Sequence, residues 1–198
     1  MNRIGVTGGI ATGKSTVAAM WAKHPGVVVI EADHLVHEAY QPGTPTHAAV
    51  VQQFGPGILN PDQTINRQRL GDLVFADEQK RLALNQIVHP VVRAMWTKRL
   101  EELSREGRVQ TVVAVIPLLF EVGAENEFDY VVTVGCSEGV QRARLQARGL
   151  SPERAEARIL SQWPLKVKLD RADFVIWNDG ALAVTEKQAA MIWQRVQN

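Results

Sequence analysis

The chain of 198 residues has a single cysteine, Cys136, and almost no net charge. One thiol cannot form an intramolecular disulfide, and its place in the apolar stretch YVVTVGC favours a small buried side chain over a reactive thiol. The formal net charge of +1 argues against a large nucleic-acid-binding surface, because such surfaces concentrate basic residues on one face. A local pocket for an anion is still compatible with this charge.

Long apolar stretches are also missing. The N-terminal sequence MNRIGVTGG lacks the apolar segment of a signal peptide, and no apolar run approaches the about 20 residues of a membrane-spanning helix. We therefore expect a cytoplasmic protein that binds neither membranes nor nucleic acid. We expect a monomer or a weak homo-oligomer.

Five short β-branched runs stand out: RIGVTG, GVVVIEAD, QTVVAVIP, FDYVVTVGC and ADFVIWN. None alternates between apolar and polar residues, which is typical of strands covered on both faces, as in parallel sheets. Segments with helical spacing lie between most of these runs. The pattern predicts an α/β protein whose parallel strands are joined by right-handed crossovers.

Residues 35–107 contain no convincing strand and are predicted to form a helical insertion that makes one wall of a substrate site. Capping residues, prolines and glycines predict where its helices begin and end. The expected starts are at Thr46, which precedes HAAVVQQF, at the caps Asn66 and Asp77, and at Pro90, which opens VVRAMWTKRLEELSRE; the expected ends are at Gly55 and Gly107.

A second segment, VQRARLQARGLSPERAEARIL, is rich in arginine. We expect two helices, separated at Gly149, with Ser151 and Pro152 at the start of the second. The arginines are Arg142, Arg144, Arg148, Arg154 and Arg158. They form either a mobile cationic flap over a phosphate site or a solvated helical face with Glu153 and Glu156 as counter-charges.

Residues Gly8 to Ser15, GGIATGKS, match the phosphate-binding pattern G-x-x-x-x-G-K-[ST] in full. A predicted strand precedes the loop and a predicted helix, STVAAMWAK, continues it, as a P-loop requires. Consecutive N–H groups can then turn towards phosphate oxygens, and the helix N-terminus adds partial positive charge. Lys14 can reach the β and γ phosphates, and the Ser15 hydroxyl can bind Mg²⁺. The sequence predicts a site for a nucleoside triphosphate.

Polar residues near strand ends are candidates for the receiving side of the site. Glu31 and Asp33 follow the second predicted strand, at the sheet edge where ligands bind in open parallel sheets. Asp33 either deprotonates an attacking hydroxyl or caps a helix that begins at His34. His89 precedes a proline, which is more typical of a structural junction. Glu121, just past the third strand, either faces the site or is an ordinary surface carboxylate.

A nucleotide-dependent switch is the alternative from another functional class. Guanine-specific switches carry the motif Asn-Lys-x-Asp, which does not occur in this sequence. The third predicted strand, TVVAVIP, also lacks the terminal aspartate of a Walker B strand. Transfer of phosphate to a small molecule is therefore favoured.

A set of motifs spans nearly the whole chain: TGGIATGKST, EAD at 31–33, PGTP at 42–45, FG at 54–55, IVHP at 87–90, IPLLFE at 116–121, the spacing Gln141–Arg144–Arg148, Gln162, and ADFVIWNDG at 172–180. In this order they resemble the dephospho-CoA kinase family, the enzymes of the last step of coenzyme A biosynthesis. The set is much more specific than the P-loop, which many families share. One departure is Glu31, where the family usually has aspartate.

The resemblance implies a P-loop nucleotide-kinase fold, with a five-stranded parallel sheet flanked by helices, a helical CoA-binding insertion and a small lid. The implied parts are a core of 1–34, 108–140 and 160–198, an insertion of 35–107 and a lid of 141–159. The implied reaction transfers phosphate from ATP, with Mg²⁺, to the ribose 3′-hydroxyl of dephospho-CoA. The alternative is another small-molecule or nucleoside monophosphate kinase of this fold.

The resemblance also implies roles for individual residues. Asp33 would be the base that accepts the proton of the 3′-hydroxyl, and Lys14, Arg144 and Arg148 the other catalytic residues. The implied ATP site consists of Gly8, Gly9, Ile10, Ala11, Thr12, Gly13, Lys14, Ser15, Thr16, Arg142 and Asn178. The implied substrate side consists of Asp33, Glu31, His89 and Glu121.

Overall fold

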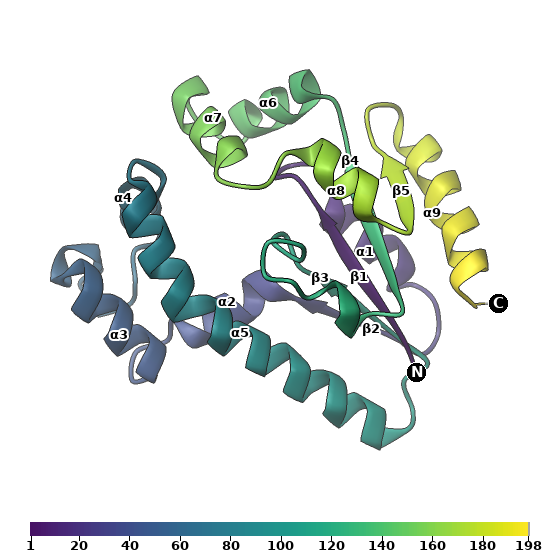
Figure 1. Cartoon of the computed structure of the whole chain (residues 1–198), viewed down its shortest axis with the longest axis horizontal. Helices are drawn as coiled ribbons and strands as arrows, with labels where there is room; N and C mark the ends of the chain where they lie inside the picture. The colour runs from purple at the N-terminus through teal and green to yellow at the C-terminus, as the bar shows by residue number, and fades with distance from the viewer. Residues whose placement is uncertain (198) are drawn as a thin grey trace. The chain divides into compact units, whose positions relative to one another are not determined.

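All five predicted strands form one parallel sheet in the computed structural model, which describes residues 1–197. The strand order is β2-β3-β1-β4-β5, so that β1 lies in the middle between β3 and β4 (Figure 1). The strands are β1 Asn2–Gly8, β2 Val27–Glu31, β3 Thr111–Val115, β4 Tyr130–Gly135 and β5 Phe174–Trp177. The predicted sheet is confirmed.

Helices connect the strands. They are α1 Lys14–Trp21, α2 Ala32–Ala39, α3 Pro45–Phe54, α4 Arg67–Phe75, α5 Glu78–Glu106, α6 Glu138–Ala147, α7 Pro152–Leu160, α8 Leu165–Arg171 and α9 Leu182–Gln197, with short 3-10 helices η1 Pro56–Ile58 and η2 Glu125–Glu127. Among the helices of residues 1–197, none combines the length and the apolar character that crossing a bilayer requires.

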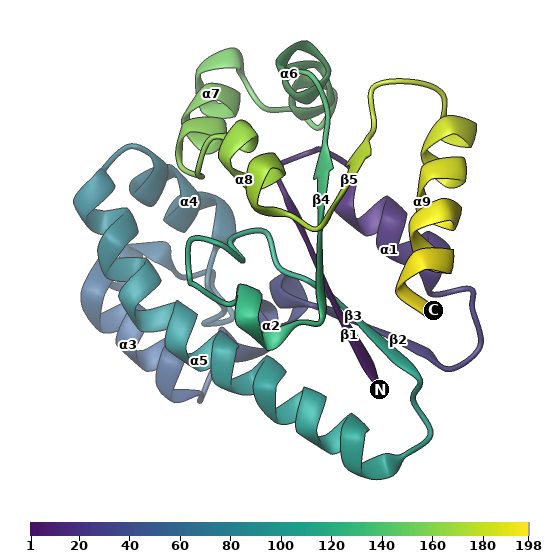
Figure 2. The same ribbon diagram turned by 45° about the vertical axis from the view of Figure 1, so that its right-hand side comes forward.

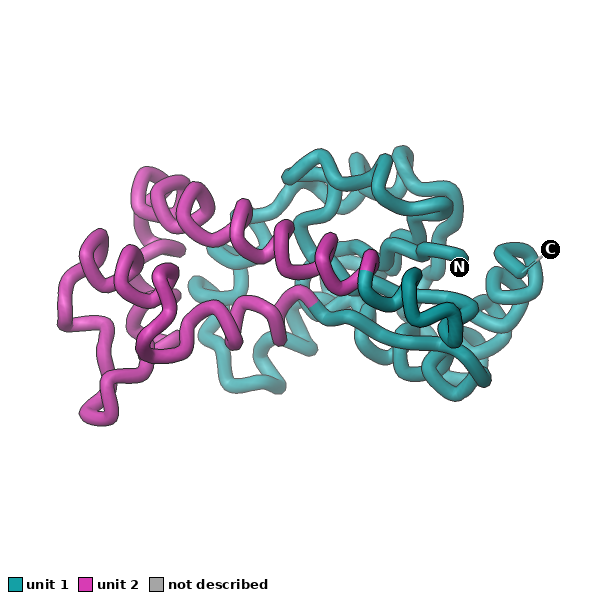
Figure 3. The backbone as a smooth tube through the Cα atoms, turned by 90° about the horizontal axis from the view of Figure 1, so that it is seen from below, with its two compact units in different colours: residues 1–31, 102–198 teal, residues 32–101 magenta. Residues whose placement is uncertain are grey.

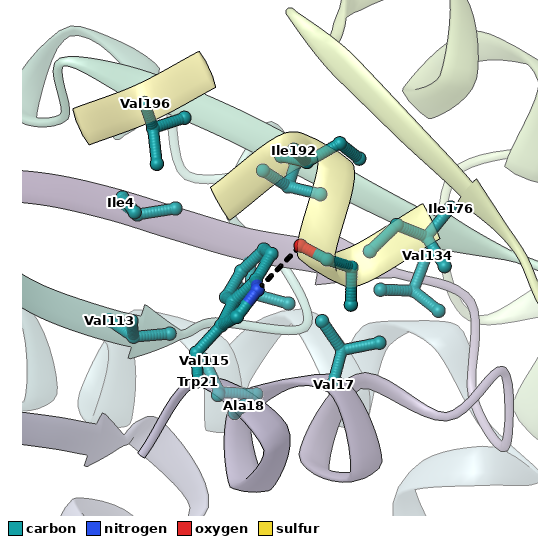
Figure 4. Packing of buried hydrophobic residues seen from close by; sticks show 13 residues of the cluster. Ile4, Val17, Ala18, Trp21, Val113, Val115, Val134, Ile176, Ile192 and Val196 are labelled. Carbon is teal, nitrogen blue, oxygen red and sulfur yellow. Dashed lines mark hydrogen bonds between the residues drawn. The ribbon is translucent and has the colours of Figure 1, made fainter. Parts of the chain in front are cut away.

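A large hydrophobic core lies between the sheet and the helices α1 and α9. Ile4 and Val6 of β1 are completely buried and pack with side chains of the other strands, because alternate residues of a strand point to the same face. Figure 4 shows Trp21 of α1 among these side chains, with its Nε1 donating to the carbonyl of Ala189 in α9 at 3.0 Å. This packing places the end of β1 next to the start of α1.

The opposite face of the sheet is covered by α8, which contacts β1 and β4 (Figures 1 and 2). Thr133 on this face donates to the carbonyl of Lys168 in α8 at 3.0 Å. Gly5 also lies on this face, where a Cβ would come within 2.7 Å of the Leu119 side chain. Both faces of β1 are therefore packed, as its continuous apolar run predicts.

The arginine-rich segment forms two neighbouring helices, α6 and α7, as predicted (Figure 2). Gly149 between them has φ +84°, and the Ser151 hydroxyl accepts from the N–H of Arg154 at 3.3 Å to cap α7. Leu145 and Ala155 join the two helices in a small buried cluster that also contains Ala11 of the predicted P-loop. The helix pair is thus built onto that loop.

The chain divides into two compact units, coloured in Figure 3. One consists of residues 1–31 and 102–198 and holds the sheet; the other consists of residues 32–101 and is helical. No strand of the sheet falls within 32–101, in agreement with the helical character expected of this region. The helical unit begins and ends earlier in the sequence than the expected insertion of 35–107.

Two helix caps of the helical unit are confirmed and one expected start is wrong. Asn66 caps α4 by accepting from the N–H of Arg69 at 3.0 Å, and Asp77 accepts from the N–H groups of Gln79 and Lys80 at the start of α5. The helix expected from Thr46 begins at Pro45 instead, because the Thr44 hydroxyl accepts from the N–H of His47 at 3.1 Å.

The expected helix start at Pro90 is also wrong, because Pro90 lies inside the continuous helix α5. A proline here removes the N–H that would bind the carbonyl of Gln86. Both residues are exposed, so that solvent can satisfy this carbonyl. Buried residues follow one side of the helix across the proline, at Val88, Val92, Trp96, Leu100 and Leu103. Packing along this stripe favours one helix. The end at Glu106 before Gly107, which has φ +68°, is as predicted.

Candidate nucleotide-binding site

The predicted P-loop connects the end of β1 at Gly8 to the start of α1 at Lys14. Gly8 has φ +140° and Gly13 has φ +104°, which is the left-handed region that side chains disfavour. A Cβ on Gly8 would also collide with the carbonyl of Val134 in β4. The glycines of the motif are therefore needed for the path of the backbone.

Lys14 folds its ammonium group over the loop. Its Nζ donates to the carbonyl of Gly9 at 2.7 Å and to that of Gly8 at 3.3 Å. The Thr12 hydroxyl donates to the same Gly9 carbonyl at 2.9 Å. The loop thus holds a cation and the N-terminus of α1 together, which favours a polyanion such as a triphosphate.

Arg144 of α6 binds the backbone of the loop. Its Nη1 donates to the carbonyls of Ala11 and Thr12, both at 3.3 Å, and its Nη2 donates to the carbonyl of Asn178 at 2.8 Å. The guanidinium therefore joins α6, the P-loop and the segment after β5. Sequence reasoning assigned this arginine to the lid without finding these carbonyl contacts.

Asn178 is 6% exposed and is itself held from two sides. Its Nδ2 donates to the carbonyl of Thr12 at 2.8 Å, and its Oδ1 accepts from the Thr185 hydroxyl of α9 at 2.9 Å. Gly13 makes room for this contact, because a Cβ there would collide with Asn178 Nδ2. The predicted ATP-site residue Asn178 thus lies against the loop.

The other two predicted lid arginines have different surroundings. Arg142 donates from Nε to Glu156 at 2.9 Å and from Nη1 to Glu138 at 3.0 Å, and these carboxylates raise its pKa above the ordinary value. For Arg142, the interpretation as a helical face with Glu156 as counter-charge is the better one. Arg148 is exposed at the end of α6, and its guanidinium has no hydrogen bond or ion pair within residues 1–197.

Ser15 fits the predicted role as a ligand of nucleotide-bound Mg²⁺. Residues 1–197 contain no group of three or more His, Cys, Asp or Glu residues suited to a metal ion. A Mg²⁺ ion bound with a nucleotide needs fewer protein ligands, because phosphate oxygens and waters fill the remaining positions. Ser15 is exposed in the first turn of α1, next to Lys14, and offers one hydroxyl oxygen there.

Comparisons with known proteins show the family of the chain. The sequence model of a family described as dephospho-CoA kinase matches residues 2–184. A dephospho-CoA kinase of Symbiobacterium thermophilum is 49% identical over 195 residues, which cover 98% of this chain and 81% of that protein. The chain belongs to the dephospho-CoA kinase family.

Solved structures extend the likeness to the fold. A structure from Thermus thermophilus has a TM-score of 0.78 and 32% identity, and the alignment covers 98% of this chain and 96% of that one. Dephospho-CoA kinase from Campylobacter jejuni has a TM-score of 0.69 and 28% identity, with the same two coverages. The expected family and its P-loop kinase fold are confirmed.

The candidate residue Glu31 of this dephospho-CoA kinase family member and its single cysteine both lie in the sheet-containing unit. Glu31 is half-buried at the end of β2. It pairs with Val115 of β3, and Val115 pairs with Val6 of β1. Glu31 is therefore level with the last residues of β1, just before the P-loop. Cys136, after β4, is 1% exposed, and burial raises the pKa of its thiol, which agrees with the expected inert core residue.

Glu121 forms a buried ion pair. Its Oε1 lies 2.7 Å from Nζ of Lys168, a completely buried residue of α8, and also accepts from the N–H of Trp163 at 3.0 Å. Lys168 donates as well to the carbonyl of Pro117 at 2.8 Å. Burial lowers the pKa of Lys168, although the Glu121 carboxylate acts in the opposite direction. These contacts give Glu121 a structural role that the sequence did not reveal.

Asp33 and His89 belong to the helical unit. Helix α2 begins at Ala32, so Asp33 is an exposed residue of its first turn, and the alternative of a cap for a helix starting at His34 is wrong. His89 is half-buried in the middle of α5 and has interaction partners. The expected helix junction at this histidine does not exist.

Three residues of the site were not assigned any role from the sequence. Thr185 holds Asn178, and Gln141 and Gln162 bind the backbone of Ile10 in the P-loop. The two glutamines occur among the family motifs, which was the only signal that pointed to them. Sequence spacing does not reveal which backbone group a distant glutamine meets.

Proposed function

We propose that this protein transfers the γ-phosphoryl group of ATP to the ribose 3′-hydroxyl of dephospho-CoA, giving coenzyme A and ADP. Family membership supports the choice of acceptor. The observation that carries the donor half is the P-loop, with Lys14 on the carbonyls of Gly8 and Gly9 and with Arg144 and Asn178 behind the loop. We further propose that it works in the cytoplasm as a monomer or weak homo-oligomer.

The donor side of the proposed reaction depends on positioning and on neutralising charge. The backbone N–H groups of residues 11–16 would hold the phosphates, and Lys14 would contact the β and γ groups. Ser15 would hold Mg²⁺, which neutralises phosphate charge when it is bound. Arg148 is free to contact phosphate oxygens, whereas Arg142 is paired with two glutamates. We assign Arg144 and Asn178 to the support of the loop.

On the acceptor side, Asp33 would accept the proton of the 3′-hydroxyl. Asp33 is exposed in the first turn of α2, where the N-terminus of the helix supplies partial positive charge. Glu31 and His89 would help to form the acceptor pocket. Glu121 would act indirectly, because one of its oxygens already binds Lys168 and Trp163.

An acceptor panel tests the proposal. Purified protein with ATP and Mg²⁺ is given dephospho-CoA, AMP or shikimate, and ADP release is followed while mass spectrometry locates the new phosphate. We expect rapid ADP release with dephospho-CoA only, and a product phosphorylated at the ribose 3′ position. Release with AMP or shikimate in place of dephospho-CoA would contradict the proposal.

A further inference from the structure

Two glutamines outside the P-loop motif bind both peptide groups of Ile10. Gln162 Oε1 accepts from the Ile10 N–H at 2.9 Å, and Gln141 Nε2 donates to the Ile10 carbonyl at 2.7 Å. Gln141 lies in α6 and is 4% exposed, whereas Gln162 follows α7 and is half-buried. A side chain from α6 and one from the segment after α7 therefore bind the same residue of the loop.

The bond from Gln141 determines the direction of a neighbouring N–H group. In a planar trans peptide the C=O and N–H bonds point in opposite directions. When Gln141 holds the Ile10 carbonyl, the N–H of Ala11 must point away from Gln141. Arg144 and Asn178 hold the next two carbonyls, of Ala11 and Thr12, in the same way. Three consecutive N–H groups, those of Ala11, Thr12 and Gly13, are thus each directed by a side chain that binds the carbonyl of the same peptide.

The bond from Gln162 acts on the preceding peptide in the opposite sense. It holds the Ile10 N–H, so the Gly9 carbonyl of the same peptide points the other way. That carbonyl accepts from Nζ of Lys14 at 2.7 Å. Gln162 therefore uses one N–H that does not serve the phosphates and turns one carbonyl towards the catalytic lysine.

The loop needs this external support because part of it is strained. Ala11 has φ +59°, and a left-handed conformation costs a residue with a side chain about 1–2 kcal/mol. Such conformations persist where the surroundings determine them. Gly9 also leaves the space that Gln141 uses, because a Cβ there would lie 2.7 Å from Gln141 Nε2. The backbone and the glutamines fit one another.

We propose that Gln141 and Gln162 are positioning residues for the triphosphate: by holding the carbonyl and the N–H of Ile10, they orient the N–H groups that receive phosphate and the carbonyl that meets Lys14. This rests on the proposed ATP site in the P-loop. Gln141 lies in α6 and Gln162 follows α7. A movement of this helix pair would therefore also move Ile10 and change the affinity for ATP.

The first test compares Gln141→Met and Gln162→Met, which keep side-chain length and remove the polar group, with Gln146→Met at an exposed position of α6. ATP dissociation constants are measured by calorimetry without acceptor, together with kcat, both KM values and Tm. Removal of a buried hydrogen bond should raise the Kd for ATP by about 10-fold to 100-fold. The KM for dephospho-CoA should change by less than about twofold, and Gln146→Met should resemble wild type.

A pair of glutamate substitutions separates positioning from general damage. Gln162→Glu keeps an oxygen that accepts from the Ile10 N–H, whereas Gln141→Glu places a carboxylate against the Ile10 carbonyl. Both add one negative charge beside the same residue. We expect Gln162→Glu to bind ATP several-fold more tightly than Gln162→Met, and Gln141→Glu to bind no better than Gln141→Met.

Wild-type affinity for ATP in folded Gln162→Met, or equal affinities in Gln162→Glu and Gln162→Met, would overturn the proposal. The Gln162 variants decide the matter if the Gln141 variants do not fold. Binding of ATP is measured without acceptor, so inactivity of the wild-type protein on dephospho-CoA would contradict the proposed function and leave this result intact.

Discussion

The P-loop and the helical unit 32–101 are stabilised over different distances along the chain. Gln141 is 131 positions from Ile10, and Asn178 is 166 positions from Thr12. In the helical unit, the helix caps described above join near neighbours: Asn66 binds the N–H of the third residue after it. His47 reaches the carbonyl of Gln63, 16 positions away.

This difference follows from what each region has to do. Stabilisation of a transferring phosphoryl group depends on donors that are already oriented, so the loop must be held from outside its own sequence. A helix needs only its terminal N–H groups satisfied, which a residue at its own start can do. We expect changes near the loop to act at a distance and changes in the helical unit to stay local.

The largest expected effect is on kcat in a variant of the helical unit, and it should leave ATP binding by the P-loop unchanged. Asp33→Asn removes the proposed base of the helical unit and should lower kcat by about 10²–10⁴-fold. The Kd for ATP should stay within about twofold of wild type, because the P-loop is untouched. Kinetics and calorimetry on the same sample check both values. Glu38→Gln, at an exposed position of the same helix, is the control and should stay active. Near-normal turnover of Asp33→Asn would contradict the proposed role.

The next largest effect concerns the buried ion pair of Glu121 and Lys168, which joins distant parts of the sequence within the sheet-containing unit. Glu121→Gln leaves the buried ammonium of Lys168 without its counter-charge and should lower the free energy of unfolding by about 3–5 kcal/mol in denaturant titrations. Asp170→Asn breaks the exposed pair with Lys166 on the same helix and should change it by less than about 1 kcal/mol. Equal losses in the two variants would show that burial does not set the difference.

The same variant has an expected pH dependence. Burial lowers the pKa of Lys168 in the folded state, so between that pKa and the ordinary value of 10.5 the unfolded chain binds more protons. Stability then rises with pH in this window. The Glu121 carboxylate acts to raise the pKa of Lys168, so Glu121→Gln lowers that pKa further and the rise begins at a lower pH in the variant. Its deficit relative to wild type should therefore be largest at neutral pH and shrink towards pH 10.5. A deficit independent of pH would contradict the ionised state of Lys168.

A smaller effect distinguishes Arg142, which is paired with two glutamates, from Arg148, whose guanidinium has no hydrogen bond or ion pair within residues 1–197. Arg148→Ala should lower kcat by about 10-fold to 100-fold, the range for one hydrogen bond to a charged group, with little change in Tm. Arg142→Ala, which loses the contacts to Glu138 and Glu156, should leave kcat within about threefold of wild type. Steady-state kinetics that reverse this order would place Arg142 at the phosphates.

The smallest effect tests the local character of the helical unit. Asn66→Ala removes the cap of α4 and should lower the free energy of unfolding by about 1 kcal/mol. The Kd for ATP should be unchanged in calorimetry. A weakened affinity for ATP would show that the helical unit and the P-loop are coupled through contacts beyond these caps.

Much of the fold and half of the site could be predicted from short stretches. Neighbouring residues predict the five strands, the caps at Asn66 and Asp77 and the P-loop. Strand burial, helix capping and phosphate binding each depend on a few adjacent positions. Local signals failed where two of them competed. Pro90 indicates a helix start, but the buried stripe that crosses it extends over many more residues and prevails.

The sequence alone therefore determined the class of sheet, the phosphate-binding loop and, through the set of motifs, the family. Only the tertiary structure decided that Arg142 pairs with Glu156, that Arg144 binds loop carbonyls and that Glu121 is tied to Lys168. The physical reason is that strands, caps and loops depend on residues adjacent in the sequence. The partner of a long polar side chain is instead the group that the folded sheet and helices bring within about 3 Å of it.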